Sequence, residues 1–207
     1  FARNAQDGVQ VSGMIGLMKK LIAASGLVAA LALTGCFPTG PRASVEAPSS
    51  DTQAEDSAAE APAEETGTRA NPAPLGSTIE DGDWAVTVNS VNLNANDLIA
   101  AENQFNDAAD DGYVYILVNL TATYNGTNPD GELPWINVEY VTADGNTISG
   151  IEKLVVEPEA FDMTGTLYQG ASVTGNKAFH VPAATAGEGT LAVRAGLGGS
   201  KVFVAVQ

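Results

Sequence analysis

Every second residue of the segment 113–124 is apolar, and this alternation constrains the fold more than any other feature of the chain. Side chains of a β-strand point alternately to its two faces, so the pattern predicts a strand with one wholly apolar face. The residues of that face are Val114, Ile116, Val118, Leu120, Ala122 and Tyr124. The opposite face begins apolar and becomes polar, in the order Tyr113, Tyr115, Leu117, Asn119, Thr121 and Thr123. We therefore expect the first half of this strand to be covered on both faces.

Other segments after Pro74 show the same strand chemistry, and no long helical period competes with them. Around Asn89 and Ser90 the parity of the apolar residues changes, so a β-bulge there would keep both sets facing inward. Asp144-Gly145 is typical of a hairpin turn. Further strands are expected at Trp84–Leu93, Trp135–Thr142, near Thr147, and at Leu154–Val156, Val173–Val181, Leu191–Ala195 and Val202–Val206.

Seven or eight short strands at this spacing predict an all-β, immunoglobulin-like β-sandwich over residues 75–207. The segment Asn96–Asn106 is expected to form a short helix or an ordered loop that caps the sheet. The chain contains one cysteine, so no disulfide within the chain can support this domain. The hydrophobic core must therefore hold the fold by itself.

The segment before residue 36 has the order of a secretory signal. Met18, Lys19 and Lys20 give a positive start, and the apolar run Leu21–Leu33 follows. A helix of that run would reach about 20 Å, too short for a hydrocarbon core of about 30 Å. We interpret residues 18–35 as a signal peptide and residues 1–17 as sequence upstream of the true start.

The signal ends in Leu33-Thr34-Gly35-Cys36, which resembles the lipobox of bacterial lipoproteins. The resemblance implies cleavage between Gly35 and Cys36 by signal peptidase II, with diacylglycerol on the Cys36 sulfur as the covalent anchor. A thiolate is the nucleophile that such S-alkylation needs, and dual acylation gives stable anchoring. We expect a protein held by its lipid on the extracellular face of the cell membrane. The alternative is an ordinary secretory signal with a cysteine there by chance.

Residues 36–74 consist mainly of Ala, Pro, Ser, Thr and Glu and contain almost no large apolar side chain. Such a segment cannot bury enough surface to offset the entropy of ordering, so we expect a disordered linker after the lipidated Cys36. The whole chain carries a net charge of −16, and its basic residues do not cluster. This charge excludes nucleic acid as an expected partner, because phosphate binding needs concentrated Lys and Arg.

The domain also resembles a known family. Its motifs are Gly82–Val88, Gly112 followed by the strand to Tyr124-Asn125-Gly126, then Asp144-Gly145, Leu167–Gly170 and Ala178–Pro182. They are similar to those of the immunoglobulin-like domain of unknown function found on Gram-positive lipoproteins, which is related to the immunoprotective extracellular antigens. The resemblance covers residues 75–207 and implies a β-sandwich with no catalytic residues.

Few residues suggest chemistry. His180 is the chain's one histidine and lies within an expected strand, so a hydrolytic triad is not expected. Glu157 and Glu159 flank Pro158, which favours a surface loop over acid–base work. Asp107, Asp110 and Asp111 gather carboxylates that calcium favours, but they lack the spacing of an EF-hand. We expect a solvated loop there, with these residues as weak metal candidates, and no cofactor.

Tyr113, Tyr115 and Trp135 are candidates for an aromatic binding face, since aromatic residues are frequent at interfaces. Burial in the core is the alternative for all three. We expect a non-enzymatic binding module whose partner is an envelope protein or a glycan. Two alternatives remain, a metal-dependent or carboxylate-based envelope hydrolase and a passive structural or antigenic lipoprotein.

Overall fold

The computed structural model describes residues 44–46 and 65–207, which belong to one compact unit, Thr39–Gln207. The expected signal peptide, the lipobox with Cys36 and most of the expected linker lie outside the described residues. Within the described residues, no helix combines the length and apolar character that crossing a membrane requires.

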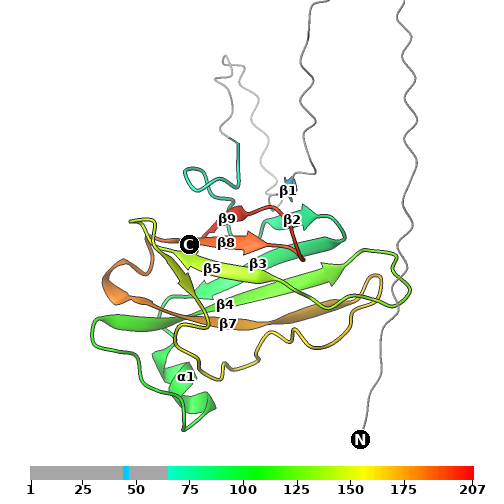
Figure 1. The fold of residues 1–207 in the computed structure, drawn as a ribbon. Coiled ribbons are helices and arrows are strands. Elements are labelled where there is room, and N and C mark those ends of the chain that lie inside the picture. Colours follow the sequence, from blue (N-terminus) through cyan, green and yellow to red (C-terminus); the bar gives the residue numbers. More distant parts are fainter. Residues whose placement is uncertain (1–43, 47–64) are drawn as a thin grey trace, which may run out of the picture. The chain divides into compact units, whose positions relative to one another are not determined.

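The described strands form two antiparallel sheets, as expected for a β-sandwich (Figure 1). The first sheet has the order β1 (Ser44–Glu46), β2 (Thr78–Asp81), β3 (Trp84–Asn92), β4 (Tyr113–Tyr124) and β7 (Ser172–Pro182). The second has the order β6 (Thr147–Ser149), β5 (Asn137–Val141), β8 (Thr190–Arg194) and β9 (Val202–Ala205). The other elements are the helix α1 (Asn96–Glu102) and the 3-10 helix η1 (Ala183–Thr185). The all-β sandwich predicted from the sequence is confirmed.

The main core lies between the two sheets, and β4 supplies its centre. The expected apolar face of β4 is buried there, from Val114 to Tyr124. The register of β3 against β4 shifts between Val88 and Ser90, which confirms the predicted bulge. Because of this shift, Val91 and Leu93 pack against the same core as Val88.

A second, smaller core lies on the outer face of β4. Tyr115 and Leu117 pack there with Ala178 of β7 and with Ala95 and Ile99 at α1. Figure 1 shows α1 on the side of β4 and β7 that faces away from β5, β8 and β9. The expectation that the first half of β4 is covered on both faces is therefore confirmed, and α1 is the cover.

The folded domain begins before Leu75, the boundary expected from composition. Ala73 is fully buried, donates its N–H to the carbonyl of Phe203 at 2.8 Å and accepts from the N–H of Ala205 at 2.9 Å. Gly67 accepts from the N–H of Phe203 at 2.8 Å. Residues 65–74 thus lie along β9, and β1 pairs with β2. These contacts use backbone groups, which side-chain composition does not report, so the linker prediction is wrong for these residues.

Two strand predictions also need correction. Leu154–Val156 lies in the loop between β6 and β7, with Leu154 and Val156 exposed. The expected strand Trp135–Thr142 is shorter, because the N–H of Trp135 bonds to the carbonyl of Leu133 and that of Ile136 to Pro134. These local bonds take N–H groups that a strand ladder would otherwise use.

Candidate functional site

An apolar hollow of the described surface lies between β5 and β7, and we call it the Trp135 groove. It has a volume of about 570 Å³, within the range of small-molecule sites. Its floor is formed by Ile136, Val138 and Phe179, which belong to the main core. Its rim carries large apolar side chains that are exposed to solvent: Trp135, Ile151, Leu154, Met163 and Leu197.

The strand edges explain why the sandwich is open here. The short strand β6 pairs with Glu139–Val141 of β5 and ends at Ser149, so Asn137 and Val138 extend beyond it. Gly150 then passes close to β7, where a side chain at this position would lie 3.0 Å from the carbonyl oxygen of Ala178. The groove therefore begins where the edges of the two sheets meet at Gly150.

The rim is unusual for its exposed apolar area. The Leu197 side chain is 85% exposed and Ile151 is 77% exposed, although both are large and aliphatic. Single exposed apolar residues are ordinary, but a contiguous group around a hollow marks an interaction site. Leu197 lies in the loop between β8 and β9, and Ile151 lies in the loop that follows β6.

Two basic residues line the same groove. Lys177 lies opposite Val118 in the register of β7 on β4, and Val118 faces the main core. Opposite residues of an antiparallel pair share a face, so the Lys177 side chain points between the sheets. Its Nζ lies 5.3 Å from the centroid of the Phe161 ring and 3.3 Å from the Met163 sulfur. Burial lowers the pKa of Lys177, and nearby Glu157 opposes that effect.

No ion pair joins either basic residue of the groove to a carboxylate within the described part of the chain. The ion pairs there join Lys153 to Asp110 and Lys201 to Glu139, and His180 pairs with Asp110 only when its imidazole is protonated. Arg194 donates from Nη1 to the Gly199 carbonyl at 3.3 Å. The Glu157 carboxylate is bonded to the backbone N–H of Ala178 at 3.2 Å. Lys177 thus forms no ion pair among the described residues, although the Glu157 carboxylate lies near enough to act on its pKa.

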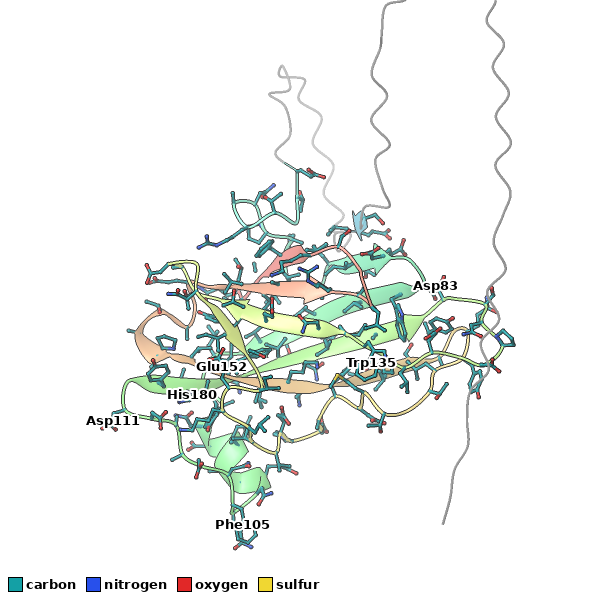
Figure 2. All side chains as sticks on the ribbon, viewed as in Figure 1. Asp83, Phe105, Asp111, Trp135, Glu152 and His180 are labelled. Carbon is teal, nitrogen blue, oxygen red and sulfur yellow. The ribbon has the colours of Figure 1, made fainter. Side chains whose placement is uncertain are left out.

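The three predicted aromatic residues do not share a face. Tyr115 is 1% exposed beneath α1, and its hydroxyl donates to the Asp107 carbonyl at 3.1 Å. The Tyr113 ring stacks on His180, with 4.6 Å between the centroids. Figure 2 shows Trp135 well apart from His180. The predicted aromatic face is therefore wrong, and Trp135 alone belongs to the candidate site.

The acidic loop before β4 is held by hydrogen bonds and one ion pair. Asp110 accepts from the Lys153 Nζ at 2.5 Å, and this bond lowers the pKa of the Asp110 carboxyl. Asp107 uses its backbone carbonyl for the Tyr115 contact. Within residues 44–46 and 65–207, no group of three or more His, Cys, Asp or Glu is placed to hold a metal ion. The structure does not bring Asp107, Asp110 and Asp111 together as a metal site.

The sequence prediction missed the most informative residue of the groove. In β7 the inward positions are Val173, Gly175, Lys177, Phe179 and Val181, which have the period of two expected of a strand. The sequence did carry a signal for it, because Lys177 stands at a position of β7 whose alternate neighbours are mostly apolar. By contrast, no local pattern marks Ile151, Met163 or Leu197, because they lie in loops and only the folded chain gathers them.

No protein-family model matches the chain, and no curated protein matches it. Two solved structures are similar. One is a conserved hypothetical protein from Bacillus anthracis, with a TM-score of 0.36 and 15% identity over 60% of this chain and 91% of that chain. The other is an uncharacterized β-sandwich protein from Clostridium difficile 630, with a TM-score of 0.40 and 12% identity over 73% of this chain and 100% of that chain.

Proposed function

We propose that this chain is a lipid-anchored protein of the outer cell surface whose β-sandwich binds an apolar ligand in the Trp135 groove without catalysis. The observation that carries the binding function is the groove itself, an open hollow of about 570 Å³. A ligand that covers its exposed aliphatic rim would bind favourably, because removing apolar surface from water lowers the free energy. The anchor is supported by the resemblance of Leu33–Cys36 to a lipobox.

The architecture suits a static binding site. The floor of the groove belongs to the main core, so Ile136, Val138 and Phe179 are fixed by packing on both sheets. The rim residues lie in loops, where side chains can adjust to a ligand. A rigid floor with an adaptable rim requires little reorganisation on binding, and preorganisation of this kind favours affinity.

The proposal is tested with the unit Thr39–Gln207, whose own hydrophobic core allows it to fold alone. The probe is dodecanol below its solubility limit in water, and the readout is the fluorescence of Trp135 on the rim. We expect saturable binding that Leu197→Ser weakens about tenfold, because a leucine contact of this size is lost. Trp135→Phe should remove the fluorescence change on binding and leave only the emission of the buried Trp84.

Phe105→Ser is the matched control. Phe105 is as exposed as Leu197 but lies in the loop after α1, away from Trp135 (Figure 2). Its replacement should leave dodecanol binding unchanged. The proposed binding function fails if dodecanol does not bind, or if Leu197→Ser and Phe105→Ser alter its binding equally.

A further inference from the structure

We infer that the ligand of the Trp135 groove is a carboxylate-bearing aliphatic chain whose carboxylate binds Lys177; this inference rests on the binding function proposed above. Two properties of the groove identify this class of ligand. Its rim and floor are aliphatic and aromatic, which suits a hydrocarbon chain. Lys177, which lines it and points between the sheets, forms no ion pair with a carboxylate among the described residues.

The position of Lys177 is the first step of the argument. Its side chain points between the sheets, where neighbouring inward positions of β7 are Phe179 and Gly175. The polar contact of its ammonium is the thioether of Met163, a weak acceptor. A partly buried ammonium without a strong acceptor is unfavourable. An anion in the groove would supply the missing acceptor.

The charge of the whole chain is the second step. A net charge of −16 repels anions from most of this surface, so general attraction cannot bring a carboxylate to the domain. The other described cations are already engaged: Lys153 and Lys201 have carboxylate partners, Arg69 donates to the carbonyls of Thr142 and Ala143, and Arg194 donates to the carbonyl of Gly199. Lys177 is therefore the described cation whose hydrogen-bond acceptor is neither a carboxylate nor a carbonyl.

The third step concerns what the ligand must lack. Glu157 lies near Lys177 and faces the groove, with one oxygen bonded to the Ala178 N–H. A second negative charge on the ligand would meet this carboxylate, so a single carboxylate is favoured over a polyanion. An aliphatic ammonium would be repelled by the ammonium of Lys177.

An inward lysine also protects an edge strand from pairing with another chain. That role needs no ligand and predicts no preference for an anion. The two explanations differ in one measurable ratio, the affinity for dodecanoate relative to dodecanol. Both probes have the same hydrocarbon chain, so their ratio isolates the contribution of the head group.

The experiment measures this ratio by fluorescence titration of the unit Thr39–Gln207, with dodecylamine as a third probe. We expect dodecanoate to bind about tenfold more tightly than dodecanol, because one charge-assisted hydrogen bond contributes a difference of this size. Dodecylamine should bind most weakly. Lys177→Met, which keeps the length of the side chain, should abolish the preference. Lys177→Arg should retain the preference for dodecanoate. Lys201 lies outside the groove, so Lys201→Met should not change this preference.

The outcomes separate the two proposals. Equal binding of dodecanoate and dodecanol, or a preference that survives Lys177→Met, overturns the carboxylate assignment and leaves the binding function intact. Failure of every probe to bind overturns both. Thermal melting of each variant identifies loss of folding, and Lys177→Arg keeps the test decisive if Lys177→Met does not fold.

Discussion

The Nε2 atom of His180 accepts a hydrogen bond from the backbone N–H of Asp110 at 3.1 Å. This contact joins β7 to the loop that precedes β4, and the Tyr113 ring stacks over the imidazole. Only a neutral imidazole has a nitrogen that can accept this bond. The relationship makes the ordering of the loop dependent on pH.

The first prediction concerns this dependence. The pKa of His180 is lowered from 6.5 by burial and by Lys153, while Asp110 partly opposes the shift. The unfolded chain therefore binds the proton more readily, so His180 stabilises the fold above pH 6.5 and this contribution is lost as the pH falls through the lowered pKa. Urea unfolding between about pH 5 and 8 should show lower stability at the acid end.

The control is His180→Gln, which can still accept from the Asp110 N–H but does not titrate. We expect a flatter dependence of the unfolding free energy on pH in this range. A variant with the same slope as the native chain would assign the dependence to titratable groups other than His180.

The second prediction concerns the cover of β4. Ile99 is 1% exposed and is the buried residue of α1, where it packs with Tyr115 and Leu117. Ile99→Ala should lower the free energy of unfolding by about 2 to 5 kcal/mol, since it leaves a cavity. Leu98→Ala, at an exposed position of the same helix, should cost less than about 0.5 kcal/mol. Chemical denaturation of both variants checks the difference, and equal losses would contradict the packing.

The third prediction compares two glycines of the loop between β8 and β9. Gly196 and Gly198 both have positive φ, at 72° and 86°. A Cβ at Gly196 would lie 2.9 Å from Cδ1 of Trp84, whereas one at Gly198 would meet nothing within 4 Å. Gly198→Ala should cost about 1 to 2 kcal/mol from backbone strain. Gly196→Ala should cost a further ~1 to 3 kcal/mol from crowding and shift the near-ultraviolet signal of Trp84.

The fourth prediction concerns the start of the domain. A chain that begins at Leu75 loses the burial of Ala73 and its hydrogen bonds to Phe203 and Ala205. Compared with the unit Thr39–Gln207, it should be less stable by about 1 to 3 kcal/mol. Hydrogen exchange of the Ala205 amide should also accelerate. Unchanged stability and exchange would place the boundary at Leu75 after all.

The fifth prediction concerns the proposed anchor. Cys36→Ala removes the thiol that would carry diacylglycerol, so the protein should shift from the membrane fraction to the soluble fraction or remain unprocessed. Thr34→Ala, which keeps a small residue in the lipobox, should leave the protein in the membrane. Fractionation followed by mass spectrometry of the N-terminus checks both. A Cys36→Ala protein that is processed and retained as firmly as the native one would remove the anchor from the proposal.

Much of the sandwich could be predicted from local patterns. The alternation of 113–124 predicted β4 and the burial of both faces in its first half, and the change of parity near Asn89 predicted the bulge. Asp144-Gly145 predicted the turn between β5 and β6. These features are local, because strand geometry fixes the direction of each side chain relative to its neighbours in the sequence.

The site could not be predicted in this way. Tyr115 and Trp135 are both aromatic and near strand ends, yet α1 covers the first and nothing in the described structure covers the second to the same extent. Residues 65–74 looked like linker but bond to β9 through their backbone. The sequence by itself determined which side chains point inward. Only the tertiary structure decided which loops cover them and that Lys177 faces an open groove, because these contacts join segments far apart in the chain.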